Sequence, residues 1–409
     1  MTASGSSRLR SRFLEFADVL LSRDSNYDLG VLSAAFLFIF MGTGALQQFL
    51  IPYLEQTTTW GTMRASLVLA TVYLGFLVWR LLAGYSIRAL GDYWAVVVGA
   101  TMYTLFAVAV LAYPQLWALL VAAFGWAWGA ALLWITSSAH VLDASRREHY
   151  GRAAGIFYAA THVGFVIGLT LLQALLDRYG GHAMLTAAIG LTGFGTLICL
   201  LVPRRDFPRD LPKLADVVKI ALGGAGRIVA VLQFAAATAY GLLLGTFASS
   251  IRHDYGTGSI AAITMSFYVM RAVVSPLVGV LSDRLGRAHV LSGAFALSAV
   301  GLLVPVIWPG AASLALAAAV LGGLTASVLA GVLAFVGDSA PSVSRQATIA
   351  GMYVWRDLGT GVTILLGQYL RVVFHGFQVP FLVFALTFAV CAWLSPKLRP
   401  AAISPADGE

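Results

Sequence analysis

The stretch GVLSDRLGRAHV, residues 279–290, is a short polar turn between two long apolar segments. Its glycines allow two helix ends to approach each other and turn sharply. The Asp can accept hydrogen bonds from a neighbouring helix N-terminus and pair with an Arg. The pattern predicts a tight polar loop between two membrane helices, defined by Gly279, Asp283, Arg284, Gly286 and Arg287.

The composition around this loop is that of a membrane protein. Of the 409 residues, 59% are hydrophobic and 11% are charged, whereas a soluble domain carries about 25% charged residues. So few charges cannot cover the surface of a soluble protein of this length, which excludes a cytoplasmic enzyme. The polar segments, of which 1–30 is the longest, leave no room for a nucleotide-binding domain.

Apolar segments of spanning length, about 20 residues, recur along the whole chain. Hydrocarbon offers the backbone no hydrogen-bond partners, so each segment is predicted to be a helix. These twelve segments lie at 31–53, 64–83, 94–113, 115–139, 152–176, 182–202, 227–250, 260–281, 288–308, 312–336, 347–371 and 377–395.

A polar, proline-containing stretch divides the twelve segments into two sets of six. It contains PRRDFPRDLPK, residues 203–213, which is typical of a linker. We therefore expect five parts, namely a cytoplasmic N-terminal segment (1–30), an N-terminal six-helix bundle (31–202), a cytoplasmic linker (203–226), a C-terminal six-helix bundle (227–395) and a cytoplasmic tail (396–409). Below, the two predicted bundles are called the first half and the second half.

The distribution of basic residues predicts the orientation in the membrane, because cytoplasmic loops are enriched in Arg and Lys. With the N-terminus placed inside, 19 of the 26 basic residues lie on the inner side, 4 lie outside and 3 lie within apolar segments. Both termini are therefore expected in the cytoplasm. The positive charge is explained by topology, so it predicts anionic lipid headgroups as neighbours and no nucleic acid.

The two halves repeat with a nearly constant offset. Gly84 and Gly279 are 195 residues apart, and so are Asp143 and Asp338. The first-half copy of the loop, GYSIRALGDY (84–93), exchanges the charges, because its Arg88 stands opposite Asp283 and its Asp92 opposite Arg287. A salt link of reversed polarity is therefore a possibility in the first loop.

Taken together, the duplicated six-helix pattern and the Gly-x₃-Asp-Arg-x-Gly-Arg loop of residues 279–287 resemble the major facilitator superfamily over about residues 30–396. The resemblance implies an all-α membrane protein with 12 transmembrane helices in two pseudo-symmetric six-helix bundles. It also implies a secondary transporter that works by rocker-switch alternating access around a central site. The loop residues, with Arg88 and Asp92 as their counterparts, would then act in gating.

A second resemblance concerns one branch of that superfamily. The runs GALQQF (44–49), ATVYLGFL (70–77) and WGAALLW (128–134) are similar to the UNC93-like branch. That branch is associated with trafficking and channel regulation as well as with transport, so the resemblance adds a non-transporting membrane adaptor to the possible functions.

Charged residues within apolar segments are costly unless they pair or meet water, and each is a candidate for function. Asp357 and Arg356 lie midway along one predicted helix, and Arg271 lies deep in another. Successive helical residues point about 100° apart, so we expect that Asp357 and Arg356 do not simply neutralise each other. Each is expected to have a partner on another helix or to face the central cavity. Asp357 would act in proton coupling or fix helix packing, while Arg271 would bind an anionic substrate or pair with Asp357.

Two further polar residues have a functional and a structural interpretation. Arg80 lies four residues before Gly84, so snorkelling to the cytoplasmic surface explains it well, and a substrate contact is the alternative. His162 lies in mid-span and could relay a proton, or it could simply be hydrogen-bonded in the core.

Amide and aromatic side chains within the predicted helices are candidates to line a cavity for an organic solute. Small-residue steps in the helices at 152–176 and 347–371, Gly164 among them, should allow close helix approach. The expected substrate-binding residues, besides Arg271 and Arg356, are Gln47, Trp134, Tyr240, Tyr268 and Tyr353.

Two mid-membrane arginines against one acid favour an anionic solute, such as a carboxylate or an organophosphate. Transport would be secondary active or facilitative, as a symporter or uniporter. The alternatives are a proton-coupled exporter of lipophilic drugs or lipids and an UNC93-like adaptor. We expect no catalytic residues, no metal and no cofactor, a small-molecule substrate with a proton as possible partner, a monomer in a lipid bilayer, and a bacterial inner membrane as location.

Overall fold

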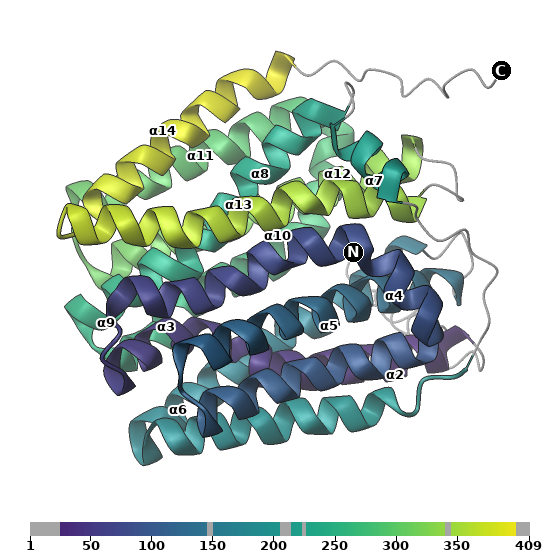
Figure 1. Ribbon diagram of the computed structural model, residues 1–409. Coiled ribbons are helices and arrows are strands. Elements are labelled where there is room, and N and C mark those ends of the chain that lie inside the picture. Colours follow the sequence, from purple (N-terminus) through teal and green to yellow (C-terminus); the bar gives the residue numbers. More distant parts are fainter. Residues whose placement is uncertain (1–24, 145–149, 205–213, 223–225, 340–344, 398–409) are drawn as a thin grey trace, which may run out of the picture.

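The computed structural model describes residues 25–144, 150–204, 214–222, 226–339 and 345–397. Nearly all of these residues are helical, and the described part contains no strand (Figure 1). The long helices run roughly side by side. The predicted all-α fold is therefore confirmed.

A helix is found at each of the twelve predicted positions. The elements in chain order are α2 (Ser25–Ile39), η1 (Phe40–Gly44), α3 (Ala45–Thr57), α4 (Gly61–Ala112), α5 (Leu116–Asp143), α6 (Tyr150–Cys199), α7 (Leu214–Leu222), α8 (Gly226–Leu242), η3 (Leu243–Phe247), α9 (Ala248–Tyr255), η4 (Thr257–Ser259), α10 (Ile260–Leu285), α11 (Arg287–Ile307), α12 (Ala311–Ser339), α13 (Arg345–Val373), α14 (Gln378–Leu394) and η5 (Ser395–Lys397).

Seven helices of the described part are long and apolar enough to cross a membrane. Two of them are unusually long, because α4 has 52 residues and α6 has 50. Each is interrupted by a glycine outside helical geometry, Gly91 in α4 and Gly180 in α6, so each holds two of the predicted spans. The apolar parts of α10 and α14 are shorter, and the full number of twelve crossings stays a prediction.

The internal repeat is visible in the backbone. Six described residues have positive φ, and they form three pairs 195 residues apart. The pairs are Gly61 (73°) with Gly256 (78°), Gly91 (76°) with Gly286 (81°), and Gly180 (80°) with His375 (55°). The offset predicted from sequence thus recurs as matching turns. His375 occupies the left-handed position after α13, where a glycine is usual.

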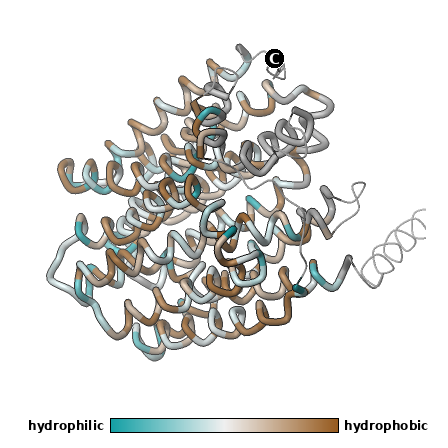
Figure 2. Tube along the Cα trace, turned by 45° about the vertical axis from the view of Figure 1, so that its right-hand side comes forward, coloured by the Kyte–Doolittle hydropathy of each residue, from teal (hydrophilic) through white to brown (hydrophobic). Residues whose placement is uncertain are grey.

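The surface of the bundle is apolar along the helices, as expected for lipid contact. Figure 2 shows hydrophobic residues along much of the helix lengths. Large apolar side chains such as Leu197, Val300 and Leu386 are more than half exposed. Hydrocarbon is the solvent that makes such exposure favourable.

The two halves meet through helices from each. Helix α4 packs against α13, and α6 packs against α10. Within the first half, Gly164 of α6 lies so close to α2 that an added Cβ would be 2.5 Å from the Leu37 carbonyl oxygen. The predicted close helix approach at this glycine is therefore confirmed.

Candidate functional site

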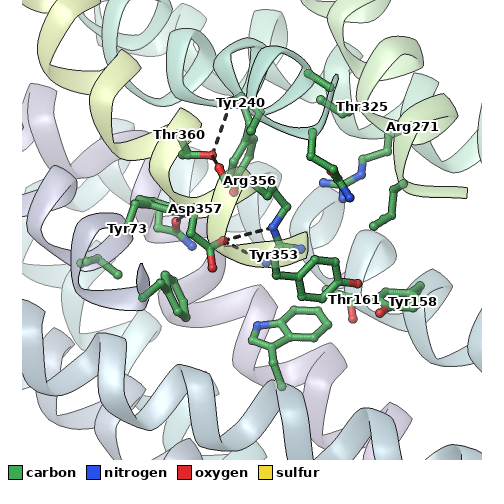
Figure 3. A pocket seen from close by; sticks show the side chains of 18 of the residues that line it. Tyr73, Tyr158, Thr161, Tyr240, Arg271, Thr325, Tyr353, Arg356, Asp357 and Thr360 are labelled. Carbon is green, nitrogen blue, oxygen red and sulfur yellow. Dashed lines mark hydrogen bonds and ion pairs between the residues drawn. The ribbon is translucent and has the colours of Figure 1, made fainter. Parts of the chain in front are cut away.

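A cavity of about 130 Å³ lies where the two halves meet. It is lined from the first half by η1, α3, α4, α5 and α6, and from the second half by α8, α10, α12 and α13. Figure 3 shows the polar side chains that converge on it. A site shared by helices far apart in sequence is where a transported solute would be held.

Four helices each present one face to the cavity, with residues three and four positions apart. In α6 this face comprises Tyr158, Thr161, His162 and Phe165. The other three faces comprise Val72, Tyr73, Phe76 and Arg80 of α4; Gln233, Ala236, Ala237 and Tyr240 of α8; and Tyr353, Arg356, Asp357 and Thr360 of α13. This spacing is the helical repeat, which brings such residues to one side of a helix.

Arg80 is not a snorkelling residue at the cytoplasmic surface. It is 1% exposed, and its Nε donates a hydrogen bond to Oδ2 of Asp357 across the boundary between the halves. The expectation of snorkelling is wrong because the helix continues past Gly84 to the break at Gly91. The break is eleven residues beyond Arg80, about 16 Å along the axis, so Arg80 lies well inside the bundle.

Arg356 also binds Asp357, although the two are neighbours in sequence. Its Nε and Nη2 donate to Oδ1 of Asp357 at 3.1 and 3.0 Å. The two residues do pair, because the long Arg side chain folds back over the 100° between them. The expected partner on another helix is nevertheless found for Asp357, which also binds Arg80, and both Arg356 and Asp357 face the cavity as expected. The Arg356 guanidinium also lies 4.0 Å from the centre of the Tyr353 ring, a cation–π contact.

Arg271 lines the same cavity but has no partner there. Its Nε is buried without a hydrogen bond, and no ion pair or side-chain hydrogen bond reaches its guanidinium from the described residues. In Figure 3, Arg271 approaches from the side opposite Asp357, and no dashed line reaches it. It therefore does not pair with Asp357 in this structure, which contradicts one of its two predicted roles.

The other predicted site residues fall into two groups. Gln47, Trp134, Tyr240, Tyr353 and His162 line the cavity. Tyr268 does not. It is fully buried beside the cavity and accepts a hydrogen bond of 2.8 Å from Gln48 of α3. Binding and proton coupling by these residues stay predictions.

The predicted gating loops are described in part. Arg88 is exposed near the end of the first helical part of α4, and Asp92 is half-buried just after the turn at Gly91. In the second loop the turn at Gly286 is described, and its φ of 81° matches that of Gly91, 76°. The side chains of Asp283, Arg284 and Arg287, and the surroundings of Gly279, lie outside what the structure describes.

Several cavity residues escaped the sequence analysis, among them Tyr158, Thr161 and Thr325. For the α6 residues a signal was available. Tyr158 is four residues before His162, and Thr161 is adjacent to His162. The helical repeat therefore places Tyr158 on the same helix face as His162 and predicts it as a cavity residue. Thr325 of α12 has no charged neighbour on its helix face and offered no such signal.

A second charged cluster joins the halves at the end of the bundle where α3 meets α9. Glu55 of α3 is 3% exposed, and its Oε2 accepts a hydrogen bond of 2.6 Å from Nη2 of Arg252 in α9. Arg371 of α13 lies 3.7 Å from Oε1 of Glu55 and donates to the hydroxyl of Thr62 at 3.3 Å. We call Glu55, Arg252 and Arg371 the end cluster.

The described residues hold no group of three or more potential metal ligands.

Comparisons with known proteins agree with this arrangement. A sequence profile described as Major Facilitator Superfamily matches residues 32–224 and 229–408. No curated protein sequence is similar enough to the chain to count as a match.

Several solved structures share the fold at low sequence identity. The E. coli fucose:proton symporter has a TM-score of 0.65 and 16% identity, covering 92% of this chain and 100% of that one. A nucleoside transporter has a TM-score of 0.72 and 14% identity over 92% and 100%. An auto-inhibited peptide transporter of the POT family has a TM-score of 0.71 and 14% identity over 91% and 96%. Identities this low show the fold alone.

Proposed function

Because the chain belongs to the major facilitator superfamily, we propose that it moves a small organic anion across a membrane by alternating access. The family identifies an integral, multi-pass membrane protein that transports a solute and is not an enzyme. The anionic nature of the solute is our proposal. One observation carries it: Arg271 lines the central cavity, and no described residue forms an ion pair or a side-chain hydrogen bond with its guanidinium.

An unpaired guanidinium inside a membrane protein needs an acceptor, because burying an uncompensated charge is costly. Arg presents a planar fork that receives a carboxylate or phosphate with two hydrogen bonds. The aromatic residues around it, including Tyr240 and Trp134, suit the organic part of a solute. Together these groups favour an organic anion over a cation or a neutral lipid.

The cavity also argues against the alternatives. An adaptor would need no polar cavity between its halves, whereas here Arg271 and Asp357 line one. An exporter of lipophilic cations would need a free carboxylate. Within the described lining, Asp357 is the carboxylate, and both of its oxygens accept hydrogen bonds from arginines.

Uptake by proteoliposomes tests the proposal. Arg271→Gln should reduce uptake of a labelled organic anion at least about tenfold, because it removes a charged hydrogen-bond donor. Arg64→Gln is the matched control, since it removes an exposed arginine and should leave uptake unchanged. If Arg271→Gln folds and takes up every anion tested as well as the wild type does, the proposal is wrong.

We further propose facilitative transport. Both oxygens of Asp357 already accept hydrogen bonds, Oδ2 from Arg80 and Oδ1 from Arg356, so the carboxylate acts in this geometry as the partner of two arginines. In the same proteoliposomes, collapsing an imposed pH gradient should not change the initial rate of anion uptake. A rate that follows the pH gradient would instead assign proton coupling, with His162 as the remaining candidate.

The orientation and location also remain proposals. The arginine distribution supports cytoplasmic termini, and the short loops suit a bacterial inner membrane. Labelling of single cysteines placed at Arg88 and Thr59, exposed at opposite ends of the first two spans, would test the orientation. An impermeant reagent on intact cells should label the cysteine at Thr59 and spare the one at Arg88.

A further inference from the structure

The cavity holds more positive charge than its own carboxylate can balance. Its described lining includes three arginines, Arg80, Arg271 and Arg356, and one acid, Asp357. With His162 counted as neutral, the formal excess is two positive charges. Because hydrocarbon surrounds the bundle, the compensating charges have to come from within the cavity.

The hydrogen bonds show which parts of these arginines are free. Asp357 already accepts from Arg80 at one oxygen and from Arg356 at the other. The Nη1 atom of Arg80 and the Nε atom of Arg271 are both buried, and neither has a hydrogen-bond partner in the part of the chain that the structure describes. Buried donors of this kind cost free energy until an acceptor arrives.

The two free donors lie at two places in the cavity. Arg80 is held at Asp357, whereas Arg271 approaches from the opposite side (Figure 3). An acceptor that satisfies both has to carry charge at two separate points. A phosphate monoester carries both charges on one group, so it suits this arrangement less well than a molecule with a carboxylate at each end.

The volume limits the length of such a molecule. The cavity measures about 130 Å³, and a cavity of about 150 Å³ is known to admit benzene. A solute of similar size has only a few carbon atoms between its charged ends.

From these observations we infer that the substrate is a short organic dianion with one carboxylate at each end. One carboxylate is received by Arg271, and the other by the Arg80–Asp357–Arg356 group. This inference rests on the proposed function, because it names the class of anion that the transporter carries. It adds Arg80 to the residues that determine specificity, which is the alternative role that the sequence offered for this arginine beside snorkelling.

A size-matched ligand series tests the number of charges. Succinate is a dianion, succinamate is its monoanionic half-amide, and succinamide is neutral. Ethyl phosphate carries two charges on one group at mildly alkaline pH. Each probe is added to the purified full-length protein, and the shift in melting temperature reports binding to the folded state.

We expect succinate to bind at least about tenfold more tightly than succinamate, which corresponds to one lost charged hydrogen bond, and succinamide not to bind. Arg271→Gln should remove the preference for succinate over succinamate. Arg271→Lys, which keeps the charge, should preserve part of it, and Arg64→Gln all of it. If Arg271→Gln does not fold, the wild-type series and Arg271→Lys still decide the question.

The outcomes separate this inference from the proposed function. If succinamate binds as tightly as succinate and is taken up by proteoliposomes, the inference of a dianionic substrate is wrong, while the proposed transport of an organic anion stands. If ethyl phosphate binds more tightly than succinate, the two-ended arrangement is wrong. If succinamide binds and is taken up as well as both anions, both proposals are wrong. If none of the four probes binds, the inference is overturned, and uptake of other anions decides the proposed function.

Discussion

Asp357 is the carboxylate on which two cavity arginines depend. It is 2% exposed and accepts hydrogen bonds from Arg80 in the other half and from Arg356 beside it. A buried charge that loses its partner is strongly destabilising, whereas a complete buried pair adds little net stability. Removing the charge of Asp357 alone should therefore lower the free energy of unfolding more than removing it together with the charge of one arginine.

We predict that Asp357→Asn lowers the free energy of unfolding by about 3–5 kcal/mol, measured as a lower melting temperature. Asn keeps the size of the side chain and removes only the charge. The double variant Asp357→Asn with Arg80→Gln should recover part of the loss, because it removes one uncompensated charge. If Asp357→Asn melts at the wild-type temperature, the ion pairs do not hold the halves together.

Between helices, close packing depends on residues without side chains. Gly164 of α6 lies against the backbone of α2 at Leu37, whereas Gly190, also in α6, has no atom within 4 Å of an added Cβ. The two positions therefore form a matched pair within one element.

We predict that Gly164→Ala lowers the melting temperature, because α2 and α6 would have to separate to admit the methyl group. Overpacking of this kind costs about 1–3 kcal/mol. Gly190→Ala should be neutral or slightly stabilising, because Ala is a better helix former than Gly. Equal melting temperatures for the two variants would contradict the close approach of α2 and α6.

The end cluster links α3 of the first half to α9 and α13 of the second. Glu55 is its acid, and it lies almost wholly buried between Arg252 and Arg371. A charged hydrogen bond between the halves at one end of the bundle should stabilise the state in which that end is closed.

We predict that Glu55→Gln shifts the population toward a state open at this end, on the order of tenfold or more. Spin labels at Thr59 and His253, both exposed near the cluster, would report longer distances in the variant. Arg64→Gln removes an exposed charge from the same region and should leave the distances unchanged. Unchanged distances in Glu55→Gln would show that the cluster does not control opening.

At the scale of the whole molecule, the halves are joined by packing and ion pairs as well as by the chain. Helices α4 and α13 pack together, and so do α6 and α10. We predict that the protein divided within 205–213 and co-expressed as two chains will copurify and transport, because the interface does not need the peptide link. Two chains that do not copurify would show that the predicted bundles are not separable units.

Much of the fold could be predicted from the sequence, and less of the site. Helix positions follow from apolar length, and the repeat follows from residues such as Gly91 and Gly286, which turn the chain in the same way. The partnership of Arg80 with Asp357 joins residues 277 positions apart, and no periodicity within one helix reveals contacts across two. Arg271 was found because a charge inside an apolar run is visible without any neighbour.

The positive excess of the cavity has an electrical consequence. A charge that crosses the full membrane potential changes in energy by about 2.3 kcal/mol for every 100 mV. When the empty carrier changes orientation, two unbalanced positive charges move through the field, so this step depends on the membrane potential. When the carrier is loaded with a dianion, almost no net charge moves. A resting potential that is negative inside would therefore draw the unloaded cavity toward the cytoplasm and leave the loaded step nearly indifferent to voltage.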